Sequence, residues 1–293
     1  MLRRPLTRLA GGLATALGLQ LVSRSYYSPV PELASLDGEV WERRSPLRGI
    51  ELSTTAQIEF AERELAEFLE EARFPRTGRW DEGRFFLDNR SYESVDAEVL
   101  YAMVRRSQPA RIVELGSGWS TLVMAEACEA NRRRGIDTQL VSYEPFPRGN
   151  VPEGTPGLSA LRRVRAQDVP LEVFEELAAG DILFVDTTHT VKLASDVNFI
   201  VLEVLPLLRP GVLVHFHDIW LPYEYHRVLV EQMGMYWAEQ YLLQAFLSGN
   251  RSFEIVWAAQ AVVREHRERV RRLVPSMSDD QWPSAFWLRR TGP

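Results

Sequence analysis

The chain has 293 residues, of which 45% are hydrophobic and 25% charged, and its formal net charge at pH 7 is −6. These values are ordinary for a soluble globular protein, and the acidic balance, with no basic stretch in the central region, argues against a nucleic acid as partner. The only cysteine, Cys128, excludes an intrachain disulfide and a cluster of thiolate metal ligands. It is best explained as a packed apolar residue in a reducing compartment, so we expect a cytoplasmic protein with one sizeable core.

Residues 1–25 begin with arginines and continue as an apolar stretch in which leucines recur near helical spacing. The stretch is too short, and too interrupted by glycine and glutamine, to span a membrane, and no small-residue cleavage site follows it. We therefore expect a basic amphipathic helix that contacts a membrane surface or a partner, with a poorly ordered tail as the alternative.

Residues 26–92 are predicted to form an extended arm followed by a helical lid. The first part, residues 26–50, is punctuated by prolines. A helix follows from Ser53, where Thr54 and Gln57 have the spacing of a capping box and the apolar residues after them form one stripe. A loop and a second helix complete the segment before the next motif.

The stretch from Arg111 to Ala127, RIVELGSGWSTLVMAEA, predicts a buried strand, a glycine turn and a helix. Gly116 and Gly118 let the backbone turn sharply and let a ligand approach the main chain, and the helix N-terminus offers unpaired N–H groups. A dinucleotide site would need a third glycine, but Thr121 stands at that position. Instead the acid Glu114 precedes the turn, which suits a ligand with an amino group.

Polar residues follow the ends of four further predicted strands. In an open α/β sheet, side chains at the carboxyl ends of parallel strands build the binding site, and an acid after the second strand can accept both hydroxyls of a ribose. Two later strands, residues 253–259 and 285–289, lack the βαβ alternation and are predicted to form an antiparallel hairpin that closes the sheet. The four strands and their following residues are 140–143 with Glu144, 164–166 with Asp168, 182–185 with Asp186, and 212–216 with His217 and Asp218.

Three helices are predicted beyond the fourth strand. One begins near Ser195, and Pro206 must kink it or end it early. A long helix in residues 224–249 carries an aromatic stripe, which we interpret as core or dimer surface before substrate wall. The charged stretch 264–272 is predicted to be a solvated helix.

The segments ELGSGWST, SYEP, AQDV, FVDTTH and LRPGVLVHFHD resemble the motifs of class I S-adenosylmethionine (SAM) methyltransferases. The resemblance covers roughly residues 90–290. It is closest to bacterial small-molecule and sugar O-methyltransferases of the macrocin O-methyltransferase type and, more distantly, to catechol O-methyltransferase. It implies a three-layer α/β fold in residues 93–293, with a Rossmann-like seven-stranded sheet and an N-terminal helical extension. It implies that SAM is bound by Glu114, Gly116, Ser117, Gly118, Glu144, Asp168 and Asp186.

The same resemblance bears on a metal site and on the lid. Some relatives bind a divalent metal with an acid after the fourth strand and an acidic pair after the fifth, and Asp186 and Asp218 match two of these positions. At the third stands His217, where Mg²⁺ would prefer an oxygen ligand. In this family the segment before the first motif commonly covers the cofactor, so the polar residues of the loop 74–92 are candidate lid contacts: Asn89, Ser91 and Tyr92.

The chemistry of methyl transfer points to catalytic residues. Transfer from a sulfonium is an in-line displacement, so positioning supplies most of the rate, but an alcohol acceptor also needs a base or a metal. An Asp-x-x-His motif whose histidine is the base occurs in the broader group, and Asp186 to His189 matches it. We therefore expect His189, His217 and Asp218 to be catalytic, with His215 able to substitute because it alternates with His217 along its strand.

These residues favour a SAM-dependent O-methyltransferase that acts on a sugar or another small hydroxylated molecule and that is able to dimerise. One alternative is a non-catalytic SAM- or glycan-binding partner of an assembly complex, because a fold does not by itself imply turnover. The other is an NAD(P)-dependent oxidoreductase. The missing third glycine and the absence of a Tyr-x-x-x-Lys pair near the site argue against it.

Overall fold

The computed structural model describes residues 14, 16–19, 27–28 and 30–292. The prediction for residues 1–25 therefore falls almost entirely outside the described residues. The chain divides into two compact units, Met1–Trp41 with His226–Tyr236, and Glu42–Tyr225 with Trp237–Pro293. The first unit contributes two short helices, η1 (Leu33–Ser35) and α10 (Arg227–Glu231), besides most of α2 (Gly38–Glu42).

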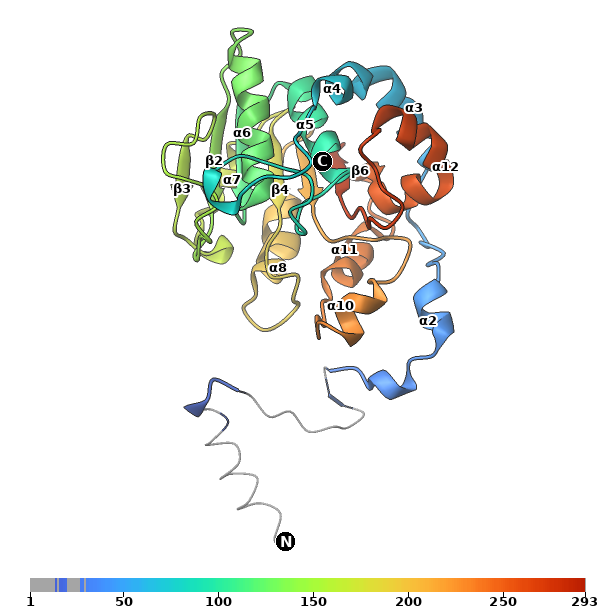
Figure 1. Cartoon of the computed structure of the whole chain (residues 1–293). Helices are drawn as coiled ribbons and strands as arrows, with labels where there is room; N and C mark the ends of the chain where they lie inside the picture. The colour runs from blue at the N-terminus through green and yellow to red at the C-terminus, as the bar shows by residue number, and fades with distance from the viewer. Residues whose placement is uncertain (1–13, 15, 20–26, 29, 293) are drawn as a thin grey trace, which may run out of the picture. The chain divides into compact units, whose positions relative to one another are not determined.

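The second unit is built on one seven-stranded sheet with the strand order β3-β2-β1-β4-β5-β7-β6. Figure 1 shows it from β3 on the left to β6 on the right. Five strands are parallel, and β7 lies antiparallel between β5 and β6. This confirms the predicted Rossmann-like fold and the antiparallel pairing of its last two strands, although α12 (Ala259–Leu273) separates them, so they are not a hairpin. The strands are β1 (Arg111–Leu115), β2 (Gln139–Tyr143), β3 (Ala160–Arg162), β4 (Ile182–Val185), β5 (Leu213–Phe216), β6 (Phe253–Ala258) and β7 (Phe286–Arg290).

Helices cover both faces of the sheet, which explains why the central strands are continuous apolar runs. Successive residues of β1 point to opposite faces, so Ile112 belongs to one buried cluster and Val113 to the other. The first cluster includes residues of α3 (Thr54–Phe60), η2 (Ala61–Leu65), α4 (Ala66–Glu71), α5 (Asp96–Ser107), α6 (Trp119–Arg132) and α12 (Ala259–Leu273). The second includes residues of η4 (Ala166–Asp168), α7 (Leu171–Glu175), α8 (Asp196–Phe199), η5 (Ile200–Val204), α9 (Leu205–Leu207) and α11 (Glu239–Leu247).

The third strand differs from its prediction. β3 comprises Ala160–Arg162, which pair with Val141 to Tyr143 of β2, and residues 164–166 lie outside it. The reason is that β3 is the edge strand, so its residues are only partly buried and show no apolar run. Residues 164–166 lead instead into the turn η4.

Two helix predictions also need correction. The cap of α3 is Ser53, whose side chain accepts from the Ala56 N–H, whereas Thr54 and Gln57 are buried and bond elsewhere. The single helix predicted in residues 224–249 is two helices, α10 and α11, and Gly234 with φ +67° lies between them. No helix within the described ranges is long and apolar enough to cross a membrane.

Candidate active site

Glu114 lies in a closed hydrogen-bond cage at the end of β1. Its fully buried carboxylate accepts hydrogen bonds from the hydroxyls of Ser120 (2.8 Å), Thr121 (2.7 Å) and Ser142. Burial disfavours the charged form and raises the pKa of Glu114 to about 7, although the three hydroxyls act in the opposite direction. The Thr121 hydroxyl also accepts from the Gly118 N–H at 3.0 Å, so it closes the turn where a dinucleotide site would have glycine.

The turn after β1 touches the end of β4. Gly116 has φ +102°, and a Cβ atom there would lie 2.0 Å from the backbone oxygen of Asp186. Only glycine fits both this conformation and this approach. Gly118 differs, since a Cβ atom there would meet nothing within 4 Å, which leaves open space above the turn. Ser117 lies between them, with its hydroxyl 3.1 Å from that of Thr121.

His189 joins three carboxylates at the carboxyl edge of the sheet. Its Nδ1 lies 2.8 Å from Oε2 of the buried Glu239, and its Nε2 lies 3.2 Å from Asp186 Oδ1 and 3.5 Å from Asp218 Oδ2. Burial alone would lower the pKa of His189, but the hydrogen bonds to Asp186 and Glu239 hold it well above its ordinary value. The acids therefore hold this imidazole as a cation at neutral pH.

His217 approaches the same two aspartates from β5. Its Nδ1 lies 3.7 Å from Asp186 Oδ2 and 3.6 Å from Asp218 Oδ1. Its Nε2 lies 3.3 Å from the Ser284 hydroxyl and 3.6 Å from Asp96 Oδ2. Burial opposes the charged form, but the negative charge of Asp218 and its neighbours raises the pKa of His217 to about 9.

Asp186, His217 and Asp218 form a group that could hold a metal ion, because one ligand atom from each lies within 4.8 Å of the others. The hydrogen bond from His189 and the charges of the histidines outweigh the burial of Asp186 and lower its pKa to about 2. Two carboxylates and one imidazole suit a divalent cation that accepts both oxygen and nitrogen, more readily than Mg²⁺ with its preference for oxygen.

His215 has a different environment from the other two histidines. It is fully buried, its ring lies 4.2 Å from that of Phe184 and 4.8 Å from that of Trp287, and its Nδ1 has no hydrogen-bond partner. Burial holds its pKa well below the ordinary value, so it is neutral. It shares the face of His217 but packs among aromatic rings.

Comparison with known proteins identifies the domain that carries this site. Residues 113–219, which run from β1 to just beyond β5, match the family described as a methyltransferase domain. Residues 113–219 therefore form a methyltransferase domain. A methyltransferase domain agrees with the predicted motifs and argues against the oxidoreductase hypothesis.

Several proteins resemble this chain at low identity. A protein of Archaeoglobus fulgidus, described as uncharacterized, is 26% identical over 161 residues, which are 52% of this chain and 71% of that protein. An apo-structure of CmcI is 19% identical and covers 69% of this chain and 73% of its own, with a TM-score of 0.42. The structure of MycE from the mycinamycin biosynthetic pathway, in complex with Mg, SAH and mycinamycin VI, is 14% identical. It covers 78% of this chain and 55% of its own, with a TM-score of 0.36.

The fold does not bring all of the predicted site residues into one cluster. Glu144 follows β2, is half-buried and accepts from the Phe146 N–H at 2.7 Å. Asp168 is exposed and forms an ion pair with Arg165, with Asp168 Oδ2 2.6 Å from Arg165 Nε. Neither contacts the Asp186–His189–His217–Asp218 cluster. Both lie after strands on the other side of β1, where an extended ligand would reach them from the turn at Gly116.

Sequence reasoning missed three residues that hold the histidines in place. Glu239 begins α11, Asp96 begins α5, and Ser284 precedes β7. All three are buried, and the Asp96 carboxylate accepts from the Ser284 N–H at 2.7 Å while the Ser284 hydroxyl contacts His217. An acid in the first turn of a helix is ordinarily explained by the helix dipole, so the sequence contained no signal that separates these acids from others.

Proposed function

We propose that this methyltransferase transfers the methyl group of SAM to a hydroxyl of a small molecule, a sugar or another hydroxylated compound, with His189 as the general base. One observation carries the proposal. A buried histidine is bonded through Nδ1 to a buried carboxylate, Glu239, and directs Nε2 toward the aspartates at the edge of the sheet where the cofactor turn lies.

The Glu239–His189 pair supports a base at Nε2. A carboxylate that accepts from Nδ1–H fixes the tautomer, so that the lone pair of the neutral ring stands on Nε2. It also stabilises the imidazolium that forms when Nε2 takes the hydroxyl proton. Since His189 is charged in the free site, it must lose its proton before it can act. Neutralising Asp186 and Asp218 would favour that loss.

A divalent cation bound by Asp186, His217 and Asp218 would neutralise those two aspartates and, when bound, would act as a Lewis acid on the acceptor oxygen. For the three residues to bind it, His217 must release a proton. Asp96 and Ser284 hold the Nε2 side of His217, so its Nδ1 is the atom that faces Asp186 and Asp218.

The cofactor is proposed to lie over the turn Gly116–Gly118, as the resemblance implies. The open space above Gly118 supports this placement, and Glu144 is the proposed partner of the ribose hydroxyls. Asp168 is the proposed partner of the adenine amino group, for which it would have to share its carboxylate with Arg165. Glu114 acts on the turn rather than on the ligand, because three hydroxyls already surround its carboxylate.

The partly exposed ring of Trp237 beside His189, with the buried Tyr225 behind it, supports a ring-shaped acceptor. The ring of Trp237 lies 4.6 Å from that of His189, and Tyr225 lies 6.1 Å from Trp237 and 5.6 Å from Tyr241. Aromatic faces offer apolar area with defined geometry. These aromatic residues belong to residues 224–249, whose aromatic stripe the sequence assigns to core or dimer surface before substrate wall.

The decisive experiment compares His189→Ala with His266→Ala, a histidine on α12 that bonds to Thr54. Transfer of radiolabelled methyl from SAM to a panel of sugars and phenols is measured, with SAM affinity by calorimetry. We expect His189→Ala to lower kcat by about 10²- to 10⁴-fold, because it removes the base, and to leave SAM affinity unchanged, because the turn Gly116–Gly118 and Glu144 are kept. His266→Ala should match the wild type. An unchanged kcat in His189→Ala would refute the base, and methylation confined to nitrogen or thiol acceptors would refute O-methylation.

A further inference from the structure

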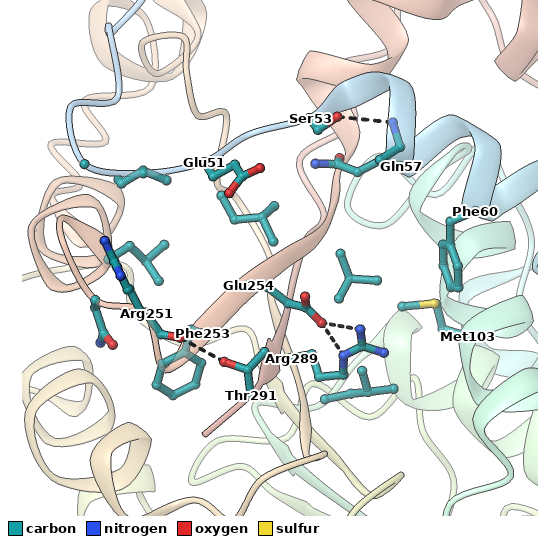
Figure 2. A pocket seen from close by; sticks show the side chains of 18 of the residues that line it. Glu51, Ser53, Gln57, Phe60, Met103, Arg251, Phe253, Glu254, Arg289 and Thr291 are labelled. Atoms are coloured by element: carbon teal, nitrogen blue, oxygen red, sulfur yellow. Dashed lines mark hydrogen bonds and ion pairs between the residues drawn. The ribbon is translucent and has the colours of Figure 1, made fainter. Parts of the chain in front are cut away.

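A cavity lies beside β6, the edge strand of the sheet, away from the turn Gly116–Gly118. It has a volume of about 990 Å³ and is bounded by the arm and α3 on one side and by β6 on the other. Leu213, the first residue of β5, lines the cavity. The cavity therefore lies near the amino end of β5, whereas His217 and Asp218 follow its carboxyl end. Figure 2 shows Glu51, Ser53 and Gln57 on the arm and helix side, facing Glu254 and Arg289 of the sheet.

The backbone of β6 turns unpaired groups toward this cavity. β6 is the last strand of the sheet, and the Thr291 N–H donates to the Ser252 oxygen at 2.9 Å. Hydrogen bonds in an antiparallel pair fall on alternate residues, so Phe253 and Ile255 direct their N–H and C=O groups outward. None of the described residues forms a hydrogen bond with those outward groups. Both residues line the cavity.

Gln57 supplies a buried, unpartnered donor in the same wall. Its Oε1 accepts from the Ala258 N–H at 2.8 Å, which fixes the orientation of the amide. Its Nε2 has no hydrogen-bond partner among the residues that the structure describes, although Gln57 is only 3% exposed. A buried amide nitrogen without an acceptor is costly unless a ligand supplies one. The Gln57 amide accepts a hydrogen bond from the β6 backbone, as a peptide group of a neighbouring strand would.

We propose that this cavity binds an extended peptide segment of a partner protein, which pairs with β6 between Phe253 and Ala258. Only a repeating backbone offers donors and acceptors at the spacing of Phe253, Ile255 and the Gln57 amide together. The edge from Phe253 to Ala258 spans about 17 Å, enough for four to six residues. Residues 49–57, which include the start of α3, line the side of the cavity that faces β6, and a space bounded on both sides favours a single segment over the sheet of a second copy.

Charge and side-chain pattern specify the peptide. Alternate side chains of a bound strand would point inward, toward Phe60 and Met103, and outward to the rim. At the rim Arg289 is paired with Glu254, and Arg106 with Glu64, but Arg251 forms no ion pair among the described residues. The segment therefore has alternating apolar residues and an acidic side chain for Arg251.

The test uses the full chain and capped seven-residue peptides of alternating valine and threonine, in which one threonine is replaced by glutamate or by lysine. Fluorescence anisotropy should show the glutamate peptides binding at least about tenfold more tightly than the lysine peptides. Arg251→Glu should reverse that preference, whereas Arg132→Glu, an exposed charge reversal on α6, should not. Hydrogen exchange at Phe253 and Ile255 should slow when the glutamate peptide binds.

The substitution Gln57→Glu distinguishes the contribution of the amide donor to peptide binding from the contribution of Gln57 to folding. It keeps an oxygen for the Ala258 N–H and removes the amide donor, so peptide affinity should fall by about tenfold while SAM affinity stays the same. Equal binding of the glutamate and lysine peptides, or no slowing of exchange at β6, would overturn the proposal. So would exchange protection of Phe253 that rises with protein concentration in the absence of peptide, since that outcome assigns the edge to a second copy.

Discussion

Two polar centres lie at the carboxyl edge of the same sheet, and they solve the problem of a buried charge differently. Around Glu114 three neutral hydroxyls donate to one carboxylate, and no charged partner is present. Around His189 and His217 the partners are themselves charged. Carboxylate oxygens of Asp186 and Asp218 lie 3.2 to 3.7 Å from Nε2 of His189 and Nδ1 of His217. The first centre is closed and shapes the backbone. The second has carboxylates that are one-fifth to one-third exposed, so a ligand can reach it.

The substitution Gly116→Ala should disturb both centres at once. The new Cβ atom would stand 2.0 Å from the Asp186 oxygen, in a conformation with φ +102° that alanine disfavours. We expect the free energy of unfolding to fall by about 3 kcal/mol and SAM binding to be lost. Urea denaturation and calorimetry measure the two effects. Gly118→Ala is the matched control, because its Cβ atom meets no neighbour within 4 Å and the fold should keep its stability.

Replacement of Glu239 tests the charged centre alone. Glu239→Ala removes the acceptor for His189 Nδ1, so we expect kcat to fall by about 10- to 100-fold with little change in the KM for SAM. Glu239→Gln retains an acceptor oxygen and should recover part of the loss. Nitrogen chemical shifts of the His189 ring report the tautomer directly. A wild-type tautomer and kcat in Glu239→Ala would remove Glu239 from the mechanism.

Cation binding should depend on pH through His217. Its pKa of about 9 means that the imidazole carries a proton at neutral pH, and a metal must displace that proton. Affinity for Mn²⁺ or Mg²⁺ should therefore rise by up to about tenfold per pH unit below pH 9. In the apo-protein the contribution of His217 to folding stability changes with pH in the opposite direction. The raised pKa of His217 contributes stability below pH 6.5, and this contribution is lost as the pH rises from 6.5 to about 9.

Titration of wild type and Glu114→Gln isolates the closed centre. Glu114 has a pKa raised from 4.5 to about 7, so the folded state binds more protons than the unfolded state between these values. Its contribution to stability is therefore present below pH 4.5, falls between pH 4.5 and 7, and is constant above. The difference in unfolding free energy between the two proteins should change over this window by about 1 to 3 kcal/mol. A difference independent of pH would contradict the raised pKa.

The sequence predicted the sheet well, where burial on both faces forces long apolar runs, as in Ile182 to Val185. It failed at β3, because an edge strand with one neighbour needs no such run. For the site, the residues directly after strands were predicted, and the structure brings Asp186, His189, His217 and Asp218 together. Their roles stay predictions.

The residues that hold this cluster were not predicted, for a physical reason. Glu239 reaches His189 across 50 positions of the chain, and Ser284 reaches His217 across 67. Such contacts depend on how helices pack and on where β7 inserts. Local spacing contains no information about either.

The insertion of β7 between β5 and β6 also orders events during protein synthesis. Both neighbours of β7 precede it in the chain, so a nascent polypeptide that has emerged only as far as β6 still has two unpaired sheet edges. Ser284 lies just before β7 and arrives with it, carrying the hydroxyl and N–H that meet His217 and Asp96. The sheet and the contacts of Ser284 with His217 and Asp96 are therefore completed together, and a chain that stops before residue 284 has neither.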